Sequence, residues 1–114
     1  MDYCRILRML AVRDDRFFEL VAPDESENVL VSQLTDGQAA LARFGALIAL
    51  DASPSSYMRV ADFALSAGVT VEELVGTLVA VIPVVGGDRA VSAAQKVGLA
   101  VGYDVDAALE DPNY

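Results

Sequence analysis

The polar residues best suited to chemistry gather where one helix is expected to begin. Ser53 precedes Pro54, a pair typical of a helix N-cap followed by proline at the first helical position. Ser56 and Tyr57 follow in the first turns. Because a helix N-terminus offers free amides and a partial positive charge, Ser53, Ser56 and Tyr57 could bind an anion or donate hydrogen bonds to a small substrate. In the alternative interpretation, Ser53 only caps the helix and Ser56 fills its first turn.

Two arginines are candidates for binding the anionic group of a ligand. Arg43 is the only charged residue between Asp36 and Asp51, and its helical neighbours are apolar, so it needs a partner. That partner could be a ligand carboxylate, an acid across a subunit interface, or solvent. Arg59 stands three residues before Asp62, a spacing that predicts an ordinary surface ion pair.

The reactive residue types restrict the chemistry further. The chain has one cysteine, Cys4, and no histidine. A disulfide framework, a zinc cluster and a histidine proton shuttle within one subunit are therefore excluded. We expect no cofactor and no bound metal.

Composition and charge indicate the kind of partner. The 114 residues suit one domain, and their net charge is −9. An acidic surface repels phosphate backbones and anionic headgroups, which disfavours nucleic acid and membrane surfaces as partners. The chain is 54% hydrophobic with a mean hydropathy of +0.41, more than a solvated monomer of this size needs. We therefore expect a homo-oligomer.

Neither secretion nor membrane insertion is indicated. The first twenty residues mix charged and apolar side chains, unlike a signal peptide. The longest uncharged run, residues 74–87, is too short to span a bilayer. A cytoplasmic location is expected.

The pattern of apolar residues predicts an all-α protein, because no segment keeps a period-two alternation. We divide the chain into a helical extension over residues 1–36, a domain over 37–108 and a polar tail over 109–114. In the extension we predict a helix over residues 3–13 and a short helix from Asp14 or Asp15 to Val21. Residues 22–32 contain Pro23 and several acids, which favours a loop that is briefly extended at 29–31.

The domain is punctuated by clear start and stop signals. Asp36 is expected to cap a helix over 38–50 that is apolar on nearly every side and hence central. The helix opened by Ser53 and Pro54 should end at Gly68, and Thr70 with Glu73 forms a capping box for the next. The remaining predicted boundaries are a kink or break near Pro83, a separation at Gly86 and Gly87, a helix from Asp88 to Gly102, and a last turn over 105–110 capped by Asp104.

A family resemblance appears across these helices. The run ALIALDASPSSYMRVADFALSAGVTVEELV at residues 46–75, followed by PVVGG at 83–87, resembles the carboxymuconolactone decarboxylase family, which includes the AhpD-like alkylhydroperoxidases. The likeness covers roughly residues 37–108. It implies an AhpD-like helical domain that assembles into dimers, trimers or hexamers.

The chain departs from that family at its redox centre. The peroxidase branch carries Cys-x-x-Cys-x-x-x-His before Gly-Val-Thr, and counting back from Gly68 places the histidine on Val60 and the cysteines on Ser56 and Ser53. The family's upstream acid falls at 41–43, where no carboxylate stands. Peroxide reduction needs a thiolate and a second thiol to store electrons, whereas serine stores none and has no histidine to activate it. We expect no thiol peroxidase activity, although the family name implies an alkylhydroperoxidase or peroxiredoxin-type function.

Two functions remain open. One is a cofactor-free enzyme of decarboxylase or lyase type acting on a small carboxylated or lactone-like molecule. There Arg43 or Arg59 would hold the anion, Ser53, Ser56 and Tyr57 would donate hydrogen bonds, and Tyr57 or a carboxylate such as Asp51 would act as general acid. The other is a non-catalytic oligomeric subunit that binds a ligand or a partner.

Overall fold

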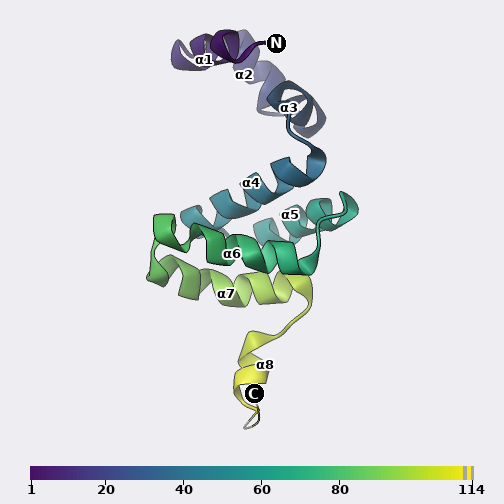
Figure 1. Cartoon of the computed structure of the whole chain (residues 1–114), viewed down its shortest axis with the longest axis vertical. Coiled ribbons are helices and arrows are strands. Elements are labelled where there is room, and N and C mark those ends of the chain that lie inside the picture. Colours follow the sequence, from purple (N-terminus) through teal and green to yellow (C-terminus); the bar gives the residue numbers. More distant parts are fainter. Residues whose placement is uncertain (112, 114) are drawn as a thin grey trace. The chain divides into compact units, whose positions relative to one another are not determined.

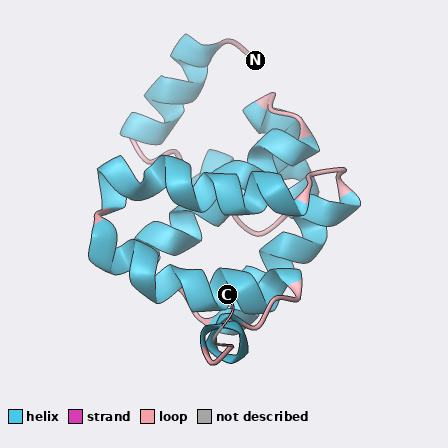
Figure 2. Ribbon diagram, turned by 60° about the horizontal axis from the view of Figure 1, so that its bottom comes forward, coloured by secondary structure: helices cyan, strands magenta, loops and turns pink. Residues whose placement is uncertain are grey.

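The computed structural model describes residues 1–111 and 113, and every regular element in them is a helix (Figure 2). The prediction of an all-α fold is confirmed. In chain order the helices are α1 (Tyr3–Ala11), α2 (Asp15–Val21), α3 (Glu25–Ser32), α4 (Asp36–Leu50), α5 (Pro54–Ser66), α6 (Val71–Val85), α7 (Gly87–Val101) and α8 (Val105–Leu109). Residues 1–35 and 36–114 form two compact units.

In the first unit, an aspartate opens each helix. The Asp2 carboxylate accepts from the Arg5 amide at 3.0 Å, and the Asp14 carboxylate accepts from the Phe17 amide at the same distance. The predicted start of α2 is confirmed. Helix α1 ends at Ala11 rather than at Arg13, because Arg13 takes the left-handed conformation with φ at +53°.

The prediction of a loop over residues 22–32 was wrong. Helix α3 occupies most of this stretch. Asp24 caps it by accepting from the amides of Ser26 and Glu27 at 3.0 and 3.1 Å, and acidic residues in the first turn suit the positive end of the helix dipole. The acids that suggested a loop are therefore the start signal of a helix, placed just after Pro23.

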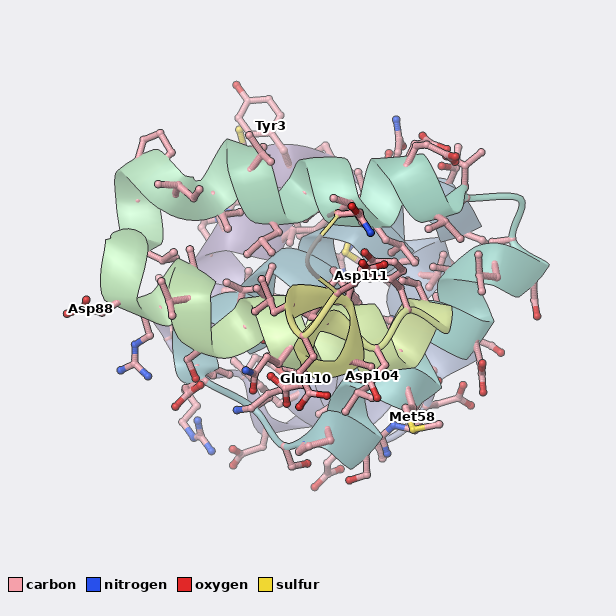
Figure 3. All side chains as sticks on the ribbon, turned by 90° about the horizontal axis from the view of Figure 1, so that it is seen from below. Tyr3, Met58, Asp88, Asp104, Glu110 and Asp111 are labelled. Carbon is pink, nitrogen blue, oxygen red and sulfur yellow. The ribbon has the colours of Figure 1, made fainter. Side chains whose placement is uncertain are left out.

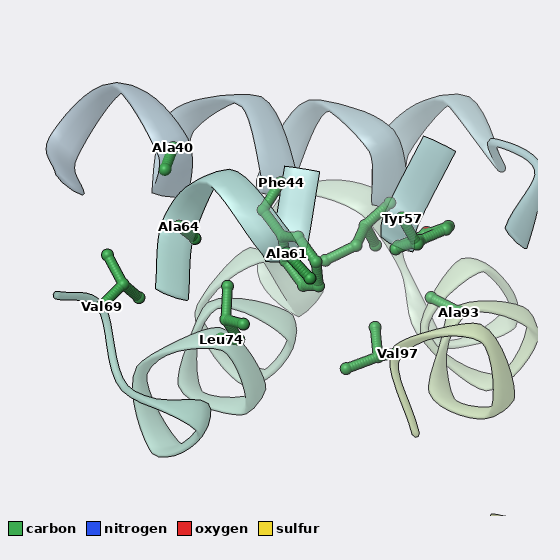
Figure 4. Packing of buried hydrophobic residues seen from close by; sticks show 10 residues of the cluster. Ala40, Phe44, Tyr57, Ala61, Ala64, Val69, Leu74, Ala93 and Val97 are labelled. Carbon is green, nitrogen blue, oxygen red and sulfur yellow. The ribbon is translucent and has the colours of Figure 1, made fainter. Parts of the chain in front are cut away.

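The second unit is built on four helices that pack in a ring. Helix α4 contacts α5 and α6, and α7 contacts the same two helices, while α8 packs against α7 (Figure 1). The four largest fully buried side chains are Phe44 and Ile48 of α4, Tyr57 of α5 and Leu74 of α6. Figure 4 labels Phe44, Tyr57 and Leu74 among the packed core residues. Burial of such side chains contributes about 1.5–3 kcal/mol each to folding. The predicted central helix, α4, does supply two of them.

Most boundaries of these helices follow the predicted signals. Ser53 caps α5 with Pro54 in its first turn, and Gly68 follows α5 with φ at +87°. Both bonds of the capping box are formed, from the Thr70 amide to Glu73 Oε1 at 2.9 Å and from the Glu73 amide to Thr70 Oγ1 at 3.1 Å.

Three boundaries differ from prediction. Asp36 is the first residue of α4 rather than its cap. The break predicted near Pro83 is absent, since helix α6 runs through Pro83 to Val85, and the alternative of a kink there stays a prediction. Proline removes one backbone hydrogen bond, but Val81 and Val85 on either side of Pro83 pack against the core and hold this last turn in place. Helix α7 begins at Gly87, one residue before Asp88, which projects from this end of the bundle (Figure 3).

The end of the chain follows prediction closely. Gly102, with φ at +87°, ends α7, and the Asp104 carboxylate accepts from the Ala107 amide at 3.1 Å to open α8. None of the helices in the described residues is long and apolar enough to cross a membrane.

Candidate functional site

A polar cluster surrounds Asp51, in the turn between α4 and α5. Its Oδ1 atom accepts from Ser92 Oγ at 2.7 Å and from Lys96 Nζ at 3.0 Å. Arg89 Nη1 lies 3.7 Å from Oδ2, and Lys96 also donates to the carbonyl oxygen of Ala52 at 2.8 Å. Because Ser92, Lys96 and Arg89 all lie on α7, the cluster ties this turn to α7.

The hydrogen bond from Ser92 and that from Lys96 lower the pKa of the Asp51 carboxyl below its ordinary value of 3.8. Asp51 is therefore ionised at neutral pH and has no proton to donate. The hypothesis that Asp51 serves as a general acid is not supported by this geometry, since its oxygens bind cations and a hydroxyl of the same chain.

The serines at the start of α5 contact one another. Ser53 Oγ accepts from the Ser56 amide at 3.4 Å and lies 3.2 Å from Ser56 Oγ and 3.1 Å from Ser55 Oγ. Ser53 is exposed and Ser56 is half-buried. The hydroxyls thus form a small network centred on the N-cap of the helix. This agrees with the alternative interpretation, in which Ser53 only caps the helix.

Tyr57 is fully buried among apolar side chains. Its ring and the Phe44 ring pack in a T-shaped arrangement, with centroids 5.5 Å apart (Figure 4). Burial raises the pKa of the Tyr57 phenol, and the negative charge of Asp51 raises it further. The Tyr57 hydroxyl is buried and has no hydrogen-bond partner among the described residues. Such a group normally finds a partner, so it is the one polar atom of the predicted site that the fold itself leaves unexplained.

The two candidate arginines do not converge on Tyr57. The Arg43 guanidinium lies over the ring of Phe63, 5.4 Å from its centroid. Phe63 is six residues after Tyr57, or about 9 Å further along α5. Arg59 is exposed and two residues after Tyr57, which places it about 200° around the helix and on the opposite side. Of the side chains predicted to form the site, only the serines therefore contact one another.

One surface contact differs from prediction. The ion pairs within the described part of the chain both involve Asp51, and Arg59 and Asp62 do not form the pair expected from their spacing. Both side chains are exposed, where such a pair stabilises a helix by no more than about 0.5 kcal/mol. Solvation of the two separate charges by water therefore competes with formation of the ion pair.

The residues around Asp51 were missed in the sequence because no local pattern connects them. Ser92 and Lys96 lie 41 and 45 residues from Asp51 along the chain.

In the residues that the structure describes, no group of three or more acidic, cysteine or histidine side chains could hold a metal ion. Cys4 is exposed and is not disulfide-bonded.

A second surface stands out on α6. Its residues Gly76, Val79, Ala80 and Pro83 are exposed on the side away from Leu74, which is fully buried. Val79 exposes 63% of its surface. With this outward apolar face, defined by the four exposed residues, α6 is apolar on two opposite sides. Such a helix is normally covered by other protein.

Comparison of the chain with family models, with curated proteins and with solved structures finds no match.

Proposed function

We propose that the chain is a carboxymuconolactone decarboxylase-like subunit without the redox centre, which works by assembly and binding rather than by electron transfer. The family part of this proposal is supported by the sequence pattern at residues 46–75 and 83–87. The observation that carries the assembly part is the outward apolar face of α6. An exposed apolar surface of this kind marks a site of association in soluble proteins.

The use of the polar groups supports the same proposal. Ser53 caps α5, Asp51 joins its turn to α7, and Arg43 lies over Phe63. Each of these side chains is engaged in holding the subunit together. A site that turned over a small acid would instead direct an anion-binding group and a proton donor toward one point.

The test is the mass of the full chain in solution, measured by light scattering after size-exclusion chromatography over a wide range of concentration. The proposal predicts a mass of two or more copies at high concentration. A mass of one copy throughout the range would contradict it.

A second candidate is a cofactor-free enzyme or binding protein for a small carboxylated or lactone-like molecule. It is favoured by one observation, the buried Tyr57 hydroxyl without a hydrogen-bond partner among the described residues. A ligand that accepted a hydrogen bond from this hydroxyl would satisfy it.

A thermal-shift screen of small carboxylates and lactones tests this candidate, because a ligand that binds the folded state raises the melting temperature. A compound that stabilises the wild type but not Tyr57→Phe would support it. Equal shifts in the two proteins, or none, would argue against it. Tyr103→Phe is the matched control, since Tyr103 is exposed.

A further inference from the structure

Helix α1 is covered on one narrow side. Among its residues only Ile6 and Met9 are half-buried, and all the others are exposed. Ile6 and Met9 are three residues apart and therefore lie on the same side of the helix. Within its own unit α1 packs against α2. Most of the circumference of α1 is thus open, which is unusual for a helix rich in large apolar residues.

Three of these apolar side chains form a strip along the open side. Tyr3, Leu7 and Leu10 are spaced at i, i+4 and i+7, so they lie within an arc of about 60° around the helix. They expose 74%, 58% and 41% of their surfaces. This spacing is the one by which an amphipathic helix places its anchors on a partner protein. We call these three residues the apolar strip of α1.

Two arginines lie beside the apolar strip on the open side. Arg8 and Arg5 follow at about 100° and 160° beyond Leu7 around the helix. Both are exposed, and neither takes part in the ion pairs of the described residues, which involve Asp51. A partner that approaches α1 from the side away from Ile6 therefore meets apolar and basic side chains next to each other.

The charge of this segment is opposite to that of the rest of the chain. Residues 1–13 hold three arginines and one acid, Asp2, whose carboxylate caps α1. Residues 14–114 hold 16 acids and five bases. A cationic helix on an acidic protein is complementary to an acidic partner, whose carboxylates would pair with its arginines.

We infer that α1 docks on another protein, at a surface where apolar side chains lie beside a row of carboxylates, as on one side of an acidic amphipathic helix. Tyr3, Leu7 and Leu10 pack on the apolar side chains of the partner. Arg8 and Arg5 pair with its carboxylates. This surface is separate from the outward apolar face of α6, and the inference does not depend on the proposed function.

Charge favours a protein over an anionic lipid bilayer as this partner. The unit of residues 1–35 holds seven acids and four bases, so its net charge is negative. A bilayer presents negative charge to the whole unit and repels it. A protein surface that matches the nine residues of α1, about 13 Å in length, contacts the cationic helix alone.

A nuclear magnetic resonance titration of the full chain tests the inference. The probe is a helical peptide with leucines along one face and glutamates along the adjacent face. The backbone amide signals of α1 should shift as the peptide binds, and the same peptide with glutamine for every glutamate should bind about fivefold more weakly. Equal affinity for the two peptides, shifts only outside α1, or no binding up to about 1 mM peptide would overturn the inference.

Matched variants test the two strips separately. Leu7→Gln keeps a good helix former and should bind the glutamate peptide about tenfold more weakly, and Arg8→Glu about fivefold more weakly. Leu65→Gln and Arg59→Glu make the same changes at exposed positions of α5 and should bind like the wild type. Circular dichroism checks that all four variants fold. Folded Leu7→Gln and Arg8→Glu proteins with wild-type affinity would overturn the inference.

Two other occupants of the apolar strip are outcomes of the same variants. Vesicles of phosphatidylcholine with phosphatidylserine should not bind the full chain in a flotation assay. Vesicle binding that Arg8→Glu abolishes would assign α1 to lipid and overturn the inference. A mass of two copies that returns to one copy in Leu7→Gln would assign the strip to a second copy and would overturn it as well.

Discussion

Lys96 on α7 donates a hydrogen bond to Asp51 in the turn between α4 and α5, with a nitrogen to oxygen distance of 3.0 Å. The same ammonium group donates to the carbonyl oxygen of Ala52 at 2.8 Å. Two backbone segments far apart in the sequence are thereby joined at the point where α5 begins. The polar residues nearest to the predicted site are thus part of the packing of the bundle.

The first prediction concerns the pH dependence that Asp51 confers. The pKa of Asp51 is lowered, so the stability that its charge contributes is present above its ordinary value of 3.8 and is lost as the pH falls through the lower folded value. Asp51→Asn should unfold at lower urea concentration than the wild type near neutral pH. The difference should shrink as the pH falls below 3.8 and through the lower pKa of the folded state.

The matched control is Asp62→Asn, at an exposed carboxylate that forms no ion pair in the described part of the chain. Asp62→Asn should unfold at the same urea concentration as the wild type at each pH. If Asp51→Asn also unfolded with the wild type near neutral pH, the contact between the turn and α7 would not hold the bundle together.

The second prediction concerns the buried hydroxyl of Tyr57. Leaving a buried polar group without a partner is unfavourable by about 1–3 kcal/mol. Tyr57→Phe keeps the ring against Phe44 and removes the hydroxyl, so the free energy of unfolding should rise by about 1 kcal/mol. A decrease on chemical denaturation would mean that the hydroxyl has a hydrogen-bond partner in solution.

The same substitution should change the response to alkali. The pKa of Tyr57 is raised above its ordinary value of 10.0, so the folded protein is disfavoured once the pH rises beyond that value and the unfolded chain ionises. The wild type should therefore lose stability relative to Tyr57→Phe above about pH 10. If the free energies of unfolding of the two proteins changed in parallel from neutral pH to about pH 11, burial of the Tyr57 phenol would be contradicted.

The third prediction compares two glycines. Gly98→Ala places a Cβ atom 2.6 Å from the Tyr103 oxygen, a backbone atom that cannot turn aside, and should destabilise the fold by about 1–3 kcal/mol. Gly76→Ala adds a Cβ in open space and should stabilise the isolated subunit by about 0.5–1 kcal/mol. Thermal unfolding at low protein concentration measures both. Destabilisation by Gly76→Ala under these conditions would show that glycine is needed within the subunit.

The signals that were predictable from sequence are those made by neighbouring residues. Ser53 with Pro54, and Thr70 with Glu73, satisfy helix-end amides within three residues, so their types and spacing are sufficient. The same rule applied to Asp24 would have found α3, but the nearby Pro23 favoured a loop.

Tertiary relationships could not be predicted in this way. Asp51 and Lys96 meet only because α4, α5 and α7 pack together, and burial of the Tyr57 hydroxyl depends on all the helices that surround it. The Arg43 side chain lies over Phe63, an aromatic partner that was not among the alternatives considered for it. A list of polar residues at one helix start therefore did not define a site.

We propose that this chain does not cycle electrons, because the resemblance places Ser53, Ser56 and Val60 where the family has two thiols and an imidazole. Hydroperoxide consumption with a thiol reductant, measured for the wild type and for Cys4→Ser, tests it most directly. The account predicts no turnover above the buffer rate by either protein. Turnover that survives Cys4→Ser, or wild-type turnover that proceeds through a disulfide between the Cys4 residues of two copies, would contradict it.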